Sequence, residues 1–343
     1  MKALVLKEYG KLAIEDVPVP EVGPADVLVA VKACGICGSD VHGMDGSSGR
    51  RRPPIIMGHE AAGVIAAAGR DVTGWKAGDR VTFDSTAYCG DCEFCRRGAV
   101  NLCENRRVLG VSCEEYRRHG AFAEFVAVPQ RGLYRVPDAL PFEHAALAEP
   151  FSVAFHAVRR APVHLNDTAV VVGSGTIGLA LIQTLRLTGC GRIIAVDVAP
   201  ERLALAARLG ATETVHSGDG DAVRDIFRLS DGLGAHLAFE AVGISATVDL
   251  ALRCVRKGGA VTLVGNVAPT VDLPLQLVVT RELTLYGSCG SAGEYPACLD
   301  MMARKAIDPA ALVSALAPLT EGAAWFDRLY RKEPGLMKVV LSV

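Results

Sequence analysis

The chain has 343 residues, of which half are hydrophobic and 22% are charged, and its formal net charge is −2. These values are typical of a globular protein with two or three domains. The near-neutral charge argues against a surface for nucleic acid or an anionic membrane. No uncharged apolar stretch reaches the length of about 18 residues that a membrane-spanning helix needs. We therefore expect a cytoplasmic protein without nucleic-acid or membrane partners.

The first 150 residues read as short strands separated by turns that contain Gly, Pro or Asp. The strand-like runs lie at residues 3–6, 27–31, 63–66, 80–83 and 122–128. Many short strands with turn residues between them predict a sandwich or a barrel. Within this part, Arg50-Arg51-Arg52 is a short basic run, which predicts a solvated loop.

After Pro150 the pattern changes to buried strands that alternate with helices. The strands are expected at residues 169–172, 192–196, 213–216, 235–240, 259–264 and 283–286, and the helices at 176–187, 200–209 and 245–255. This alternation predicts a parallel sheet covered by helices on both faces.

Four of the 11 cysteines form a local cluster. An odd number of cysteines without a secretory signal argues against a disulfide framework. Cys89, Cys92, Cys95 and Cys103 have the spacing C-x2-C-x2-C-x7-C, and four thiolates in one loop suit a closed, structural zinc site. An iron–sulfur cluster and four unrelated thiols are the alternatives. Because the fourth cysteine lies only eight residues after the third, a single closed loop is favoured.

A glycine motif follows the first strand of the second half. Gly173-Ser174-Gly175-Thr176-Ile177-Gly178 is G-x-G-x-x-G between a strand and a helix, which is the dinucleotide fingerprint. Asp197 ends the next strand, where a carboxylate binds ribose hydroxyls and repels a 2′-phosphate. The motif therefore predicts NAD rather than NADP. Arg202 either stacks near the adenine or lies on a solvated helix face.

Two further segments complete a resemblance that covers essentially the whole chain. They are Cys37-Gly38-Ser39-Asp40-Val41-His42 and Gly58-His59-Glu60. With the cysteine loop and the glycine motif, they resemble the zinc-dependent medium-chain dehydrogenases of the alcohol dehydrogenase superfamily. Ala148-Glu149-Pro150-Phe151-Ser152-Val153 points to the polyol, threonine and butanediol branch.

The resemblance implies an α/β fold with two domains. A GroES-like β-barrel catalytic domain is expected at residues 1–152 and 290–343. A doubly wound parallel-sheet Rossmann domain that binds NAD is expected at residues 153–289. Family members are usually dimers or tetramers, so a homo-oligomer is expected by analogy.

The resemblance also implies roles for individual residues. Cys37 and His59 would ligate a catalytic zinc together with Glu60 or Glu149, and which carboxylate binds directly stays open. Asp40 would accept a hydrogen bond from His59, or would instead cap a helix. Ser39 and His42 would form the proton relay, since an imidazole with a pKa of about 6.5 suits that task. The remaining positions expected near the cofactor are Val264, Gly265, Ser288 and Cys289.

These features imply two zinc ions per subunit and a small alcohol substrate. Zinc would polarise the alcohol oxygen of a secondary alcohol or polyol while NAD takes the hydride. Sorbitol dehydrogenases typically carry an Arg-Tyr pair near Gly290 and Ser291, and its absence here weakens a sorbitol assignment, so that a different sugar alcohol, a diol or another secondary alcohol fits as well. The alternatives within the family are threonine, butanediol and sugar-phosphate dehydrogenases. A zinc-independent quinone reductase would lack Cys37, His59 and the cysteine loop. A non-catalytic NAD-binding structural or sensor protein is disfavoured by the complete zinc ligand set.

Overall fold

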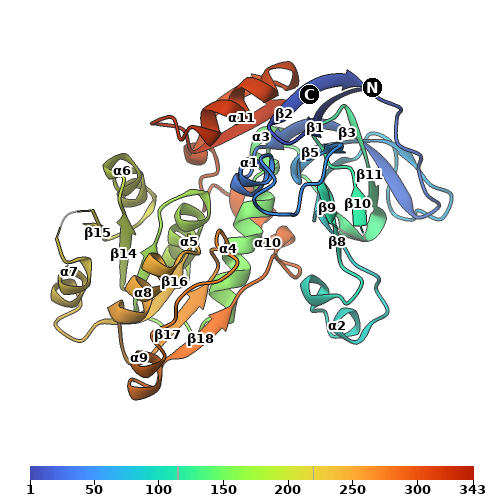
Figure 1. Ribbon diagram of the computed structural model, residues 1–343. Helices are drawn as coiled ribbons and strands as arrows, with labels where there is room; N and C mark the ends of the chain where they lie inside the picture. Colours follow the sequence, from blue (N-terminus) through green and yellow to red (C-terminus); the bar gives the residue numbers. More distant parts are fainter. Residues whose placement is uncertain (114–115, 219) are drawn as a thin grey trace. The chain divides into compact units, whose positions relative to one another are not determined.

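The computed structural model describes residues 1–113, 116–218 and 220–343, and it forms two compact units (Figure 1). One unit comprises Met1–Glu149 and Ala292–Val343, and the other comprises Pro150–Ser291. None of the helices in these described ranges combines the length and the apolarity that crossing a lipid bilayer requires.

The first unit is built on one large sheet with the strand order β12-β6-β5-β3-β20-β19, and β11 also pairs with β3. The strands of this sheet are β3 (Asp26–Gly35), β5 (Glu60–Ala68), β6 (Arg80–Phe83), β11 (Phe125–Pro129), β12 (Leu133–Arg135), β19 (Val313–Pro318) and β20 (Lys338–Ser342). β20, from the end of the chain, runs antiparallel to β3 and pairs Leu341 with Cys34. The C-terminal segment therefore contributes residues beside the end of β3.

Smaller sheets and short helices complete this unit. One sheet has the order β2-β1-β4, and the pairs β7-β8 and β9-β10 are two-stranded. Their strands are β1 (Lys2–Glu8), β2 (Lys11–Asp16), β4 (Ile55–Ile56), β7 (Thr86–Ala87), β8 (Arg107–Val108), β9 (Val111–Cys113) and β10 (Tyr116–Arg118). The helices are α1 (Gly38–Gly43), α2 (Glu93–Arg96), α3 (Phe142–Ala145), α10 (Tyr295–Ala303) and α11 (Gly322–Tyr330). Fully buried aromatic side chains such as Phe83, Phe122 and Phe326 lie in its core.

The second unit is a parallel six-stranded sheet with the order β15-β14-β13-β16-β17-β18. Its strands are β13 (Thr168–Val172), β14 (Arg192–Asp197), β15 (Glu213–His216), β16 (Ala235–Glu240), β17 (Val255–Leu263) and β18 (Thr284–Gly287). Its helices are α4 (Ala148–Arg160, which begins in the first unit), α5 (Thr176–Leu187), α6 (Pro200–Leu209), α7 (Ala222–Leu229), α8 (Ser245–Cys254) and α9 (Leu275–Thr280).

The strand order reverses direction between β13 and β16. Right-handed crossovers then place α5 and α6 on one face of the sheet and α8 on the other. The packing agrees, because α5 contacts α6 and α7 contacts α8. Ligands of such sheets bind beyond the carboxyl ends of the strands at this reversal, which is where the glycine motif follows β13.

The sequence predicted the second unit closely, and the helices at 176–187 and 200–209 have the expected bounds. The strand expected at 122–128 instead runs over Phe125–Pro129. It starts later because the amides of Ala121 and Phe122 donate to Gly58 and Met57, outside the sheet. The strand expected at 259–264 begins earlier, at Val255, and ends at Leu263.

Candidate active site

Three side chains from two neighbouring segments form a potential metal site. Cys37 precedes α1 as its N-terminal cap residue, while His59 and Glu60 lie where β5 begins. The pairing of Gly35 with Glu60 in the large sheet brings these segments together. One sulfur, nitrogen or oxygen atom from each of Cys37, His59 and Glu60 lies within 4.8 Å of the others. A thiolate, an imidazole and a carboxylate are ligands that zinc accepts, and three of them leave a fourth position open.

Asp40 orients the imidazole of His59. Asp40 Oδ2 lies 3.2 Å from His59 Nδ1, and neither buried atom has another hydrogen-bond partner among the described residues. Burial opposes the charge on Asp40, but attraction first from His59 and then from Arg51 lowers the pKa of Asp40 to about 2. Burial alone would lower the pKa of His59, whereas Asp40 and Cys37 raise it well above its usual value. With Nδ1 facing the carboxylate, Nε2 is left for a metal. Asp40 does not cap α1, whose cap position is Cys37.

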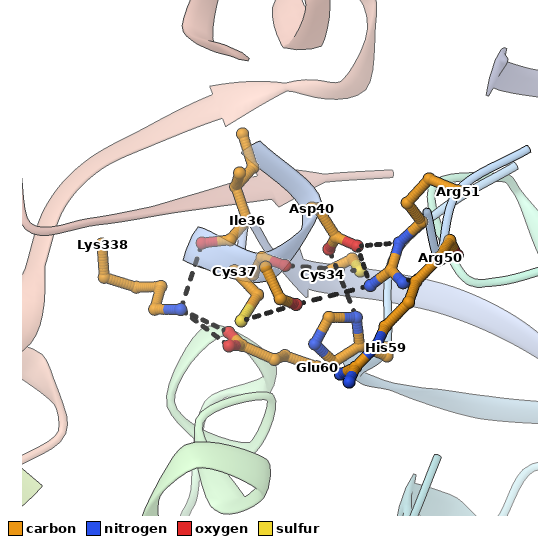
Figure 2. Close-up of polar contacts among 11 residues, drawn as sticks. Cys34, Ile36, Cys37, Asp40, Arg50, Arg51, His59, Glu60 and Lys338 are labelled. Carbon is orange, nitrogen blue, oxygen red and sulfur yellow. Dashed lines mark hydrogen bonds and ion pairs between the residues drawn. The ribbon is translucent and has the colours of Figure 1, made fainter. Parts of the chain in front are cut away.

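Glu60 is held by a lysine that the sequence analysis missed. Lys338 Nζ donates to Glu60 Oε1 and Oε2 at 2.7 Å each and to the Ile36 carbonyl at 3.1 Å (Figure 2). Lys338 is only 2% exposed. Burial by itself would lower the pKa of Lys338, but the charges of Glu60 and Cys37 raise it. Gly35 leaves room for this arrangement, since a Cβ there would lie 2.3 Å from Glu60 Oε2.

Glu149, the second carboxylate considered for the metal, lies at the start of α4. Among the described residues, the group of mutually close ligand atoms contains Glu60 and does not contain Glu149. Burial raises the pKa of Glu149 to about 7, with the charges of His59 and Glu60 acting in opposite directions. Glu149 therefore lies within electrostatic reach of the site, and Glu60 is the better-placed ligand.

The two predicted relay residues lie on α1. Ser39 is exposed, and its Oγ donates to Cys37 Sγ at 3.3 Å. His42 is also exposed, in the last turn of the same helix. Residues three positions apart share one face of a helix, so Ser39 and His42 lie on one face of α1.

The basic run next to this site differs from the prediction. Arg50 and Arg52 are exposed, as a solvated loop requires, but Arg51 is 4% exposed and forms an ion pair with Asp40. The prediction was wrong for Arg51 because the sequence gives no sign that its neighbour in space is a buried carboxylate.

The cysteine loop, residues 89–103, includes the short helix α2, and its sulfurs are spaced as in a tetrahedral metal site. One sulfur from each of Cys89, Cys92, Cys95 and Cys103 lies within 4.8 Å of the others. Cys89 Sγ is 3.5 Å from Cys103 Sγ and 3.9 Å from Cys95 Sγ. Zinc–sulfur bonds of about 2.3 Å in a tetrahedron separate the sulfurs by about 3.8 Å, so these spacings fit a zinc.

The cysteines of this loop differ in pKa. Backbone amides of Cys95 and Glu104 lower the pKa of Cys92 to about 6. Burial, together with hydrogen bonds to the other cysteines, raises the pKa of Cys95 to about 12. One thiolate thus forms readily and the next does not, and a dication would relieve the repulsion between four sulfurs.

The glycine motif has the geometry of a phosphate-binding turn. Gly173 has φ +92°, a left-handed conformation that favours glycine. A Cβ at Gly178 would lie 1.8 Å from the Gly173 carbonyl oxygen, so this position packs α5 against the turn. A Cβ at Gly175 would meet nothing within 4 Å, which leaves the N-terminus of α5 open. Thr176 and Ile177 begin this helix, where free amides and the helix dipole favour an anion.

Asp197 lies beside this turn. Its Oδ2 accepts from the Ser174 amide at 2.7 Å and its Oδ1 from the Ala199 amide at 2.9 Å. Each carboxylate oxygen keeps a second lone pair for a ribose hydroxyl. Arg202 is half-exposed on α6, with its guanidinium 4.0 Å from Asp197 Oδ2.

The other predicted cofactor positions follow β17 and β18. Val264 and Gly265 donate their amides to the Glu240 carbonyl, and Ser288 donates its amide to Leu263. Cys289 is exposed. At the carboxyl edge of the sheet, where the strands end, several buried polar atoms have no hydrogen-bond partner among the described residues. They are Ser174 Oγ, Glu240 Oε2, Thr262 Oγ1 and Ser288 Oγ. Such atoms are rare unless a ligand or water satisfies them, so the edge fits a polar ligand. The sequence analysis did not identify Thr262.

Comparison with known proteins decides the family. Residues 23–138 match the alcohol dehydrogenase GroES-like domain, and residues 176–304 match the zinc-binding dehydrogenase family. The chain is 34% identical to sorbitol dehydrogenase of Bacillus subtilis (strain 168) in an alignment of 345 positions, which covers 99% of this chain and 97% of that relative. The chain belongs to the zinc-containing medium-chain alcohol dehydrogenase family. Its class is therefore that of an oxidoreductase acting on CH–OH groups with NAD(P), and the predicted α/β fold is confirmed.

Other relatives show how broad this dehydrogenase family is. L-Threonine 3-dehydrogenase of Symbiobacterium thermophilum is 35% identical, over 84% of this chain and 82% of that relative. A zinc-binding dehydrogenase from Sinorhizobium meliloti 1021, solved with NADP bound, superimposes with a TM-score of 0.91 at 32% identity, covering 100% of this chain and 99% of that chain. Dehydrogenases with different substrates thus lie at similar identity, so the substrate has to be argued separately.

Proposed function

We propose that this dehydrogenase oxidises a secondary alcohol or polyol to the ketone, reversibly, with NAD as hydride acceptor and two zinc ions per subunit. The observation that supports it most strongly is the group Cys37, His59 and Glu60, with Asp40 behind the imidazole. A site of this composition suits a catalytic zinc with one open position, whereas the cysteine loop suits a closed one. When bound, zinc supplies a Lewis acid for the alcohol oxygen and NAD supplies the hydride acceptor.

The protein's own groups would hold the ligands and release the proton. Cys37, His59 and Glu60 hold the metal, and Asp40 fixes the imidazole through Nδ1. Ser39 and His42 are the groups that we assign to proton release from the substrate hydroxyl. Glu149 remains the alternative to Glu60 as the carboxylate ligand, since it lies within electrostatic reach of His59 and Glu60.

A substrate screen tests this proposal. The zinc-loaded protein is incubated with NAD and a panel of polyols, diols, simple secondary alcohols, sugar phosphates and threonine, and NADH absorbance is followed. We expect turnover of at least one polyol or secondary alcohol. Preference for threonine or a sugar phosphate would be consistent with the proposed mechanism but would change the proposed substrate. Turnover that survives complete removal of zinc would overturn the proposed mechanism.

We further propose that Asp197 selects NAD over NADP. Replacing it with serine removes the charge that repels a 2′-phosphate and releases Arg202 from its ion pair. A hydrogen bond to a charged group contributes about 1.5–3 kcal/mol, so the ratio of NADP to NAD efficiency should rise about ten- to a hundredfold. The measurement is kcat/KM for each cofactor with one substrate.

A second variant, Asp197→Asn, keeps the shape of the side chain and removes only its charge. Its carbonyl oxygen still accepts from one of the two amides that Asp197 binds. We expect a shift in the same direction as with serine. A ratio that stays at the wild-type value in both variants would reject Asp197 as the selector.

A homo-oligomer is proposed for this protein as well. β18 is an edge strand of the second unit's sheet, and α9 with the segment before it exposes large apolar side chains. They are Val267, Val271, Leu273, Leu275 and Val279. An unpaired strand edge beside an exposed apolar patch is typical of an interaction site, which supports association through this part of the chain.

A further inference from the structure

Arg51 is a buried arginine that the proposed mechanism does not use. It lies between the exposed Arg50 and Arg52 and is 4% exposed. A guanidinium is costly to bury unless its charge is paired and its N–H groups find acceptors. The partners of Arg51 therefore indicate why it is buried.

The first set of Arg51 contacts connects it to His59 through Asp40. Both Arg51 Nε, at 3.0 Å, and Arg51 Nη2, at 2.8 Å, donate to the same oxygen of Asp40, Oδ1. The other oxygen, Oδ2, is thereby left to face His59 Nδ1 at 3.2 Å. Figure 2 shows the Asp40 carboxylate in contact with Arg51 on one side and His59 on the other. The two donors fix the plane and rotamer of the carboxylate that orients the imidazole.

The second set of contacts connects Arg51 to Cys37 through Ser39. Arg51 Nη2 also donates to Ser39 Oγ at 3.4 Å, and Ser39 Oγ donates to Cys37 Sγ at 3.3 Å. Because Arg51 can only donate, it directs the single hydroxyl proton of Ser39 away from itself. That proton then points toward the sulfur.

The backbone around Arg51 is fixed. Ser112 donates its amide to the Arg50 carbonyl, and Arg52 donates its amide to the Ser112 carbonyl. The stem of Arg51 lies against Gly43 at the end of α1, where a Cβ would be 2.4 Å from Arg51 Cγ. Arg51 Nη1 donates to the Arg50 carbonyl at 3.1 Å. The backbone hydrogen bonds on either side of Arg51, the packing of its stem on Gly43 and the bond from Nη1 thus fix the position of the guanidinium.

We propose that Arg51 is a positioning residue that sets two zinc ligands at once, His59 through Asp40 and Cys37 through Ser39. This inference rests on the proposed catalytic metal site. A lysine could neutralise Asp40, but a single ammonium has no planar fork that reaches Asp40 and Ser39 in a fixed geometry. The expected consequence is a tighter and more uniform metal site.

The test measures metal binding by the full-length protein, independently of turnover. Arg51→Met and Arg51→Lys are compared with Arg50→Met, an exposed neighbour that loses the same charge. Chelator competition gives the dissociation constant of each metal, and the visible spectrum of the cobalt-substituted protein reports the geometry around Cys37 and His59. Loss of groups that orient metal ligands typically costs 10–100-fold in affinity, so we expect Arg51→Met to weaken the catalytic metal about tenfold and alter its spectrum.

Further variants separate positioning from charge and from folding. Arg51→Lys should recover only part of the affinity, and Arg50→Met should bind metal as the wild type does. In an Asp40→Asn background, Arg51→Met should weaken metal binding less than in the wild type, because the ion pair between Arg51 and Asp40 is already lost. If Arg51→Met does not fold, Arg51→Gln, which keeps one N–H donor group, takes its place.

Three outcomes would decide against Arg51. They are an unchanged dissociation constant and spectrum in Arg51→Met, full recovery by Arg51→Lys, and fully additive effects of Arg51→Met and Asp40→Asn. A loss of thermal stability with normal metal binding would assign Arg51 a structural role only. If the wild-type protein binds a single metal, in the cysteine loop, the proposed catalytic site itself fails, and this result is distinguishable from all the others.

Discussion

Replacing Cys37 with alanine should reduce alcohol oxidation by about three orders of magnitude or more. A metal acting as a Lewis acid contributes several kcal/mol to the transition state, and each 1.4 kcal/mol corresponds to a factor of about ten. Alanine removes the only thiolate of the Cys37, His59 and Glu60 group. It leaves the cysteine loop and the glycine motif unchanged. The variant should therefore contain one zinc where the wild type contains two, and it should still bind NADH.

The measurement combines kcat/KM on the best substrate with zinc analysis and an NADH titration. Cys190→Ala is the matched control, since this cysteine is half-buried and lies in the second unit, outside both metal groups. It should keep wild-type activity and two zinc ions. Unchanged NAD-linked oxidation in Cys37→Ala would remove Cys37 from the mechanism. Loss of both zinc ions would show that the two sites are not independent.

The features that the sequence predicted well are those that depend on neighbouring residues. The cysteine loop spans residues 89–103, and its four sulfurs meet in the structure. The strand, glycine turn and helix at residues 168–187 have a pattern that is already complete within one segment. The group Cys37, His59 and Glu60 combines two local motifs, which the antiparallel pairing of β3 and β5 brings together.

The features that the sequence could not predict depend on contacts between distant segments. Lys338 lies 278 residues from Glu60 in the sequence and reaches it only because β20 pairs with β3. The available signal was a lysine at the start of an apolar run, Val339-Val340-Leu341, where a buried charge needs a partner. Arg51 was hidden inside a basic run that is typical of solvated loops. In neither case did the expected role of the partner carboxylate, Glu60 or Asp40, point to a buried cation beside it.

The interaction between Lys338 and Glu60 predicts a large effect on stability. Replacing Lys338 with methionine keeps most of the volume and leaves Glu60, at 1% exposure, without its ammonium partner. Breaking a buried ion pair by removing one partner costs about 3–5 kcal/mol. For a unit of this size that corresponds to a decrease in Tm of roughly 6–20 °C. Bound zinc would offset part of the loss, since it also neutralises Glu60, so the decrease should be larger in metal-depleted protein.

The double variant Glu60→Gln with Lys338→Met separates an unpaired charge from simple loss of packing. If the unpaired carboxylate is what destabilises Lys338→Met, removing its charge should restore part of the lost Tm, although Glu60→Gln alone should weaken metal binding. Arg304→Met is the matched control, because Arg304 forms an exposed ion pair with Asp300. Exposed pairs contribute about 0–1 kcal/mol, so its Tm should change by no more than about 4 °C. A Lys338→Met protein as stable as this control would mean that Glu60 finds another partner, and a double variant no more stable than Lys338→Met would assign the loss to packing.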